Sequence, residues 1–156
     1  MRGSADHSKA GLLLEVTGAC VAIWGASRVG VHLLPRGDLH AMGDSGPAAI
    51  FGHVARELGK HGIAFICSRE APGDGRLGPA LKAAFGDVYI ANEKMNKTAE
   101  QLLAVGEADA VAFGQMFIAN PDLPRRLQLD ALLNEPRPET FYNPGPEGHI
   151  DYPPLV

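Results

Sequence analysis

Short apolar runs alternate along the chain with segments in which an apolar residue recurs every three or four positions. The runs predict strands over 28–34, 63–67, 88–91 and 109–113. The periodic segments predict helices over 9–23, 47–61, 79–85 and 98–105, with Asn96 as an alternative start for the last. Strands that alternate with helices predict an α/β fold with a parallel sheet and right-handed crossovers. Four such strands fit either a small doubly wound sheet or half of an eight-stranded barrel.

Two further segments complete this pattern. In the first predicted helix one face carries apolar side chains, namely those of Leu12, Leu13, Val16, Ala19 and Cys20. At the other end of the chain, residues 134–156 are rich in proline and glycine and are expected to be irregular. We therefore expect one partial domain over 1–156 with an irregular tail.

Composition narrows the classes of function. The chain has 14 Lys+Arg against 18 Asp+Glu and no basic stripe, which argues against nucleic-acid binding. Its apolar runs are shorter than a membrane span, and the polar start at 1–9 lacks the apolar core of a signal peptide, so we expect a cytoplasmic protein. Cys20 and Cys67 are expected to be buried free thiols. The six histidines show no metal-ligand spacing, so we expect no metal.

Polar, glycine-rich loops follow the predicted strands and begin at Pro35, Ser68, Asn92 and Gly114. In both candidate architectures the functional edge is the carboxyl end of the strands, where these loops lie. Two acidic residues in the loops, Asp44 and Glu70, have no evident partner and are predicted to be solvated.

The last predicted strand leads into a corner with its own signals. Gly114 allows a ligand to approach the backbone closely. Beyond it, Asn120 is predicted to cap a helix whose first turn contains Pro121 and Asp122. From spacing alone, an ordinary strand–turn–helix corner and an anion-binding turn both remain open.

Long motifs make the chain resemble the old yellow enzyme family, the FMN-dependent NADH:flavin oxidoreductases or ene-reductases. The strongest lie in the last strand and the tail, at 111–114, 117–123, 133–136, 140–142 and 148–153. Earlier segments at 24–31, 56–59 and 62–65 resemble the fifth strand of the family's barrel and the passage into its sixth. The resemblance covers almost the whole chain. It implies the C-terminal half of a (β/α)8 TIM barrel, with about four parallel strands and flanking helices.

The resemblance also implies roles for individual residues. Arg28 matches an arginine beside the flavin ring, where a cation stabilises reduced flavin. Asn92 begins a turn that meets the FMN phosphate, and Gly114 with Gln115 matches the other half of that phosphate site. Many relatives have arginine where Gln115 stands, so a charge-assisted contact is lost that Lys94 is expected to replace. Tyr142 matches an aromatic residue on the substrate side of the pocket.

The family's substrate-gripping His/Asn or His/His pair and its proton-donating tyrosine match no residue of this chain. The resemblance therefore implies an enzyme that uses NADH or NADPH to reduce activated alkenes, nitro compounds or nitrate esters, here truncated and inactive alone. The alternative is a non-catalytic half-barrel fragment. Such a fragment would self-associate, or would complement a separate N-terminal half, because it has open strand edges and an uncovered sheet face.

Overall fold

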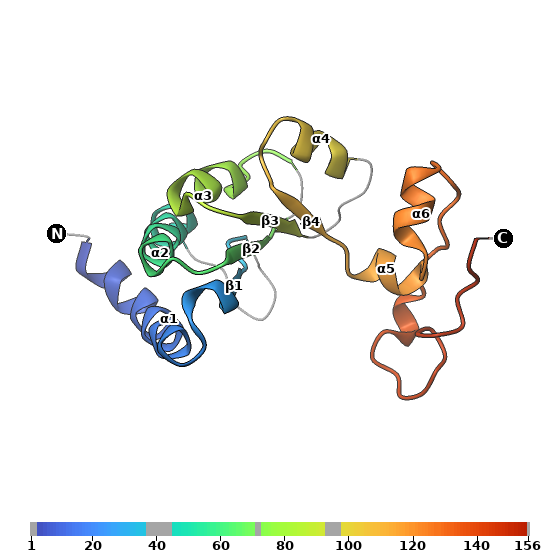
Figure 1. Cartoon of the computed structure of the whole chain (residues 1–156), viewed down its shortest axis with the longest axis horizontal. Helices are drawn as coiled ribbons and strands as arrows, with labels where there is room; N and C mark the ends of the chain where they lie inside the picture. Colours follow the sequence, from blue (N-terminus) through green and yellow to red (C-terminus); the bar gives the residue numbers. More distant parts are fainter. Residues whose placement is uncertain (1–2, 37–44, 71–72, 93–97, 156) are drawn as a thin grey trace. The chain divides into compact units, whose positions relative to one another are not determined.

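The computed structural model describes residues 3–36, 45–70, 73–92 and 98–155 (Figure 1). The chain divides into two compact units, Met1–Ala112 and Phe113–Val156. Unit 1 contains α1 (Gly3–Trp24), a 3-10 turn η1 (Ala26–Arg28), β1 (Gly30–Leu33), α2 (Pro47–His61), β2 (Phe65–Arg69), α3 (Gly78–Phe85), β3 (Tyr89–Asn92), α4 (Thr98–Ala104) and β4 (Ala110–Ala112). Unit 2 contains α5 (Gln115–Ala119), α6 (Leu123–Gln128) and a 3-10 turn η3 (Pro138–Thr140).

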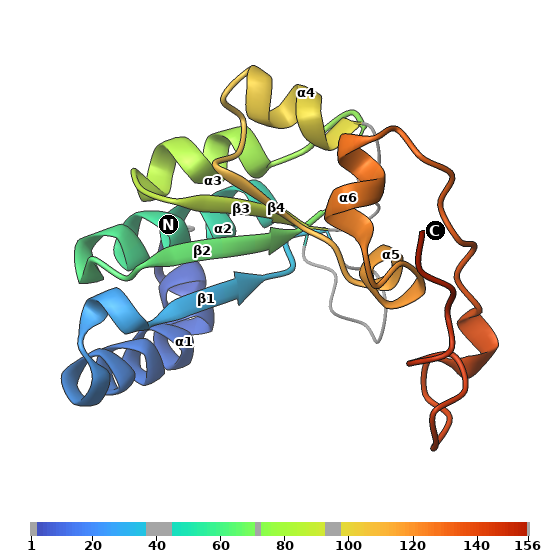
Figure 2. The same ribbon diagram turned by 45° about the vertical axis from the view of Figure 1, so that its right-hand side comes forward.

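The predicted parallel sheet is confirmed. Its four strands lie in the order β1-β2-β3-β4, every neighbouring pair is parallel, and the four arrows run the same way in Figure 2. The order in space equals the order in sequence, which is how consecutive β/α units build a barrel wall. A doubly wound sheet would instead reverse its strand order at a switch point. The topology therefore favours the half-barrel.

Side chains alternate between the two faces of this sheet. On the covered face, Val31, Leu33 and Ile66 are buried beneath the helices. Their neighbours along the strands point the other way, to a helix-free face on which His32 is exposed and Cys67 is half-buried. The ring of Phe65 lies over Gly30 on this second face, so close that a Cβ on the glycine would be 2.3 Å from the ring. Among the described elements of unit 1, the helices therefore pack against one face of the sheet only.

Several strand boundaries differ from those predicted. β1 begins at Gly30, because Ala26–Arg28 form a 3-10 turn that the sequence pattern placed partly in the strand. β2 begins at Phe65 rather than at Ile63, since the N–H of Ala64 turns back to donate to the carbonyls of Ala26 and Val29. The later strands are shifted or shortened by one or two residues at their ends.

The first helix presents the expected apolar face to solvent. α1 packs against α2 through its opposite side, where Ala10 and Thr17 are buried. Leu12 and Val16, on the apolar face that the sequence predicted, are 74% and 52% exposed. Because α1 is apolar on both sides, periodicity alone does not identify the side that packs. No helix in the described parts of the chain is long and apolar enough to cross a membrane.

In unit 2, a short helix that the sequence analysis missed follows Gly114 directly. Asn120 ends this helix, α5. The sequence predicted that Asn120 would cap the next helix, α6, and it does not. The amide of Asn120 instead donates to the carbonyl of Met116 at 2.9 Å and accepts from the N–H of Asn134 at 2.7 Å. Pro124, not Pro121, occupies the first turn of α6. The tail from 134 onward is irregular apart from η3, as expected.

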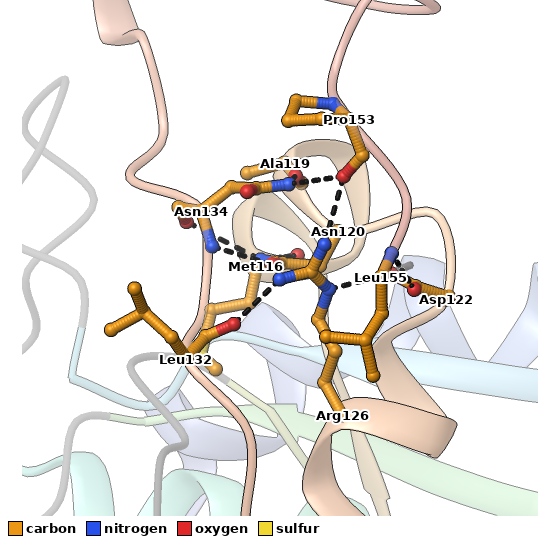
Figure 3. Close-up of polar contacts among 9 residues, drawn as sticks. All are labelled: Met116, Ala119, Asn120, Asp122, Arg126, Leu132, Asn134, Pro153 and Leu155. Atoms are coloured by element: carbon orange, nitrogen blue, oxygen red, sulfur yellow. Dashed lines mark hydrogen bonds and ion pairs between the residues drawn. The ribbon is translucent and has the colours of Figure 1, made fainter.

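A buried arginine ties the tail of unit 2 to its helices (Figure 3). Arg126 is 5% exposed and donates to the Asp122 carboxylate at 2.6 Å. The same guanidinium donates to the carbonyls of Leu132 at 2.5 Å and Pro153 at 2.8 Å. Asp122 in turn accepts from the N–H of Leu155 at 2.5 Å. The irregular tail is therefore held by specific polar contacts.

Candidate functional site

The carboxyl edge of the sheet brings together the ends of β2, β3 and β4. Asn92 is the register partner of Arg69 on one side and of Ala112 on the other. The N–H of Glu70 donates to the carbonyl of Asn92 at 3.0 Å, which extends the pairing one residue past β2. Parallel strands place their ligand-binding loops at this edge. Asn92 therefore lies where the sequence analysis expected a binding residue.

On the helix-free face, one row of register partners runs across the whole sheet. It consists of His32, Cys67, Ile90 and Ala110. The Cys67 thiol hydrogen-bonds with the side chain of Asn92, two positions further along the next strand. Burial nevertheless raises the pKa of this thiol, and the Asn92 contact offsets only part of that effect. The thiol is thus kept protonated on a half-buried patch that adjoins the carboxyl edge. Both cysteines are free, and both are half-buried rather than buried as predicted.

The sequence analysis predicted Glu70 to be a solvated charge, and this prediction was wrong. Its side chain is buried, and the whole residue is 4% exposed. The carboxylate accepts from the N–H groups of Leu77, at 2.8 and 2.9 Å, and Gly78, at 2.9 Å. Arg36, in the loop after β1, lies 4.0 Å from it and also donates to the carbonyl of Asp74 at 3.2 Å. One carboxylate thus ties the loop after β2 to the start of α3 and to the loop after β1.

Arg28 is not brought to this edge. It lies in the exposed turn η1, ahead of the amino end of β1, while Asn92 lies at the carboxyl end of β3. Four strand residues at roughly 3.3 Å each separate the two ends of β1. A β1 side chain near the carboxyl edge has to lie on the helix-free face and in the carboxyl half of the strand. His32 is the residue of β1 that meets both conditions. Strict alternation along 30–33 was the signal that could have identified it.

Gly114 and Gln115 belong to unit 2, two and three residues beyond the end of β4. The backbone at Gly114 has φ −96 and ψ −87, so no left-handed conformation requires glycine there. A Cβ at this position would meet no atom within 4 Å. Space for a ligand therefore remains beside the main chain at Gly114, and the exposed Gln115 side chain follows at the start of α5.

Three other residues were also singled out in the sequence analysis. Tyr142 is 98% exposed in the tail of unit 2. Lys94 and Asp44 lie outside the described residues. Among the described residues, no group of three or more His, Cys, Asp or Glu side chains could hold a metal ion.

Comparisons with known proteins identify the fold and the family. No family model matches the chain. 12-Oxophytodienoate reductase 1 of Oryza sativa subsp. japonica is 36% identical over 162 residues, a match that covers 97% of this chain and 43% of the relative. The structure of the old yellow enzyme from Trypanosoma cruzi matches 99% of the chain with a TM-score of 0.92 at 33% identity and is itself covered to 42%. Morphinone reductase in complex with tetrahydroNAD gives a TM-score of 0.90 at 37% identity, covering 99% of this chain and 43% of that one.

Two conclusions follow from these matches. The chain spans less than half of the length of these relatives. Identity above 30% along nearly the whole chain, together with the same fold, confirms the resemblance drawn from the sequence motifs. The 156 residues belong to the old yellow enzyme family and correspond to the C-terminal half of its TIM barrel.

Proposed function

We propose that this chain forms the phosphate side of an FMN site in an oxidoreductase of old yellow enzyme type. NADH or NADPH is the reductant, and an activated alkene, a nitro compound or a nitrate ester is the substrate. The observation that supports this most directly is the carboxyl edge of the sheet. There Asn92 ends β3 beside the last residue of β4. In the sequence, Gly114 of unit 2 follows β4 after a single intervening residue.

FMN fits the residues that each unit offers by itself, Asn92 in unit 1 and Gly114 with Gln115 in unit 2. Gly114 leaves the backbone open to a ligand, and main-chain N–H groups bind phosphate without needing a cation. Gln115 adds a neutral donor, which binds an anion more weakly than arginine would. When bound, FMN supplies the hydride-transfer chemistry, and the protein orients and tunes it.

We further propose that His32, rather than Arg28, is the side chain of β1 that faces the flavin ring. His32 is exposed on the helix-free face, and an imidazole N–H can donate a hydrogen bond to a ring carbonyl. Tyr142, whose side chain is fully accessible, keeps its proposed place on the substrate side. Neither residue supplies a proton or hydride in this proposal, so both are positioning residues.

A chimera tests the proposal. These 156 residues would replace the matched C-terminal half of the Trypanosoma cruzi old yellow enzyme. The chimera is expected to hold FMN and to reduce 2-cyclohexenone with NADPH. Gly114→Val should weaken FMN binding at least tenfold by filling the approach to the backbone, whereas Gly11→Val, at another uncrowded glycine, should leave it unchanged. His32→Ala should shift the flavin spectrum or potential, and Arg28→Ala should not. A cooperatively folded chimera without FMN would contradict the proposal.

A second candidate function is that of a non-catalytic half-barrel that acts only by association. The observation that favours it is the helix-free sheet face, where His32 is exposed and Phe65, Cys67 and Ile90 are half-buried. β1 and β4 are in addition the two edges of the sheet. Faces and edges of this kind require a partner or lead to self-association. Measuring the FMN content of the assembled protein distinguishes the two functions.

A further inference from the structure

Arg69 stands beside Asn92 at the carboxyl edge of the sheet. It ends β2 and is the register partner of Asn92, so the two side chains leave the sheet on the same face (Figure 2). That face is the helix-free one, because Asn92 hydrogen-bonds there with Cys67, which lies two residues before Arg69 in β2. Arg69 is exposed, whereas Cys67 is half-buried. A guanidinium group and an amide thus extend from the ends of two neighbouring strands.

Arg69 determines the charge on this part of the sheet. Among the strand residues that the structure describes on the helix-free face, Arg69 is the only lysine, arginine, aspartate or glutamate. The next residue in the chain, Glu70, is buried on the opposite side, where its carboxylate accepts from N–H groups at the start of α3. The described part of the helix-free face therefore carries positive charge at its carboxyl edge.

Two other arginines, in the described loops after β1 and β2, hold segments of the chain together. Arg36 lies 4.0 Å from the buried Glu70 carboxylate. Arg76 forms an ion pair with Glu107, which precedes β4. Arg69 instead extends from the face on which the proposed function places the flavin. Its position therefore suits it to bind an anionic group of the ligand.

We propose that Arg69 is the cation that binds the FMN phosphate in this chain, an inference that rests on the proposed function. In many relatives an arginine stands where this chain has Gln115, and Lys94, its expected replacement, lies outside the described residues. Arg69 starts one strand spacing, about 4.8 Å, from Asn92, where the turn expected to meet the phosphate begins. An arginine can bind phosphate through two charge-assisted hydrogen bonds, which a neutral glutamine cannot form.

Titrating the chimera with FMN and with riboflavin tests this role, because riboflavin lacks the phosphate. Arg69→Gln should lower the affinity for FMN about tenfold or more, the effect of losing a charge-assisted hydrogen bond, and should leave the affinity for riboflavin unchanged. Arg69→Lys keeps the charge and should recover part of the loss. Arg56→Gln, the same charge change at an exposed residue of α2, is the matched control. Added salt should weaken FMN binding more in the wild type than in Arg69→Gln.

Three results would overturn the role of Arg69 and leave the proposed function intact. Equal FMN affinity of Arg69→Gln and the wild type would show that other groups bind the phosphate. An equal loss of affinity for FMN and riboflavin would place Arg69 at the ring or the sugar chain. A melting temperature of Arg69→Gln clearly below that of Arg56→Gln would show that Arg69 serves the fold, since an exposed side chain otherwise contributes little to stability. A chimera that binds neither flavin would refute the proposed function, and the role of Arg69 with it.

Discussion

Individual side chains in this structure often act on the backbone of other segments rather than on each other. Glu70 holds two N–H groups at the start of α3, and Asp109 accepts from the N–H of Tyr89 at 2.8 Å and from Lys82 at 2.7 Å. The Lys82 contact, followed by the Tyr89 N–H, lowers the pKa of Asp109. Short acidic side chains thus fix the loops on either side of the strands.

Glu70→Ala is expected to destabilise unit 1, because it leaves the N–H groups of Leu77 and Gly78 without their acceptor. The cost of such unpaired buried groups is about 1–3 kcal/mol in the free energy of unfolding. Urea denaturation measures it, with Glu100→Ala, at an exposed residue of α4, as the control. Glu70→Gln should recover part of the loss, because the amide oxygen can still accept. Equal stability of the two alanine variants would contradict the role given to Glu70.

Asp122 makes the stability of unit 2 depend on pH. The Arg126 guanidinium, and next the N–H of Leu155, lower the pKa of this carboxyl from its usual value of 3.8. A carboxyl whose pKa is lower in the folded state stabilises the fold above its unfolded pKa and loses this contribution as pH falls through the folded pKa. Asp122→Asn should therefore be less stable than the wild type at pH 6, with the difference shrinking below about pH 4. Glu147→Gln, the same charge change at an exposed site, should show no such convergence.

At the scale of elements, most of the alternation of strands and helices could be predicted, because apolar periodicity is a local signal. The faces of α1 and the end of α5 could not. α1 is apolar on both sides, and the side chain of Asn120 bonds to Asn134, which is 14 residues away. Similarly, Glu70 was predicted to be solvated because its partners, the N–H groups of Leu77 and Gly78, are main-chain atoms that no sequence motif marks.

For the candidate site too, the sequence indicates some positions and not others. The sequence marks Asn92 and Gly114 because each directly follows a predicted strand, and their binding roles stay predictions. The apolar pattern could not show that Arg28 lies in a 3-10 turn ahead of β1, because a strand and a short turn carry similar residues here. The flavin role of Arg28 likewise stays a prediction.

Arg126 joins α6 to the irregular tail, so its loss should free the tail while leaving unit 1 unchanged. Arg126→Met removes the donors to the carbonyls of Leu132 and Pro153 and should cost about 1–3 kcal/mol. Hydrogen exchange followed by mass spectrometry should show faster exchange at 131–155. Arg125→Met, at an exposed neighbour on the same helix, is the matched control. Unchanged exchange in the tail of Arg126→Met would show that other contacts hold it.

For the molecule as a whole, the sheet and the helix layer both stop at edges that a complete barrel would close. The matched relatives are more than twice as long as the region that this chain matches.

We expect the 156-residue chain, expressed alone, to show no flavin absorbance and no NADPH-dependent reduction of cyclohexenone. Gel filtration with light scattering should show self-association, because the helix-free face and the free strand edges remain exposed. A monomer of 16.5 kDa with cooperative melting would contradict the second expectation. Stoichiometric FMN with turnover would contradict the first.

The reactivity of the Cys67 thiol depends on whether a second barrel half covers the helix-free face. The thiol lies on the helix-free face, where it is hydrogen-bonded to Asn92 and partial burial raises its pKa. A maleimide should therefore alkylate it slowly at neutral pH and faster as pH rises, since the thiolate is the nucleophile. Once a second barrel half covers that face, the reagent is shut out at every pH. The rate at which Cys67 is alkylated therefore reports whether a second barrel half covers the helix-free face.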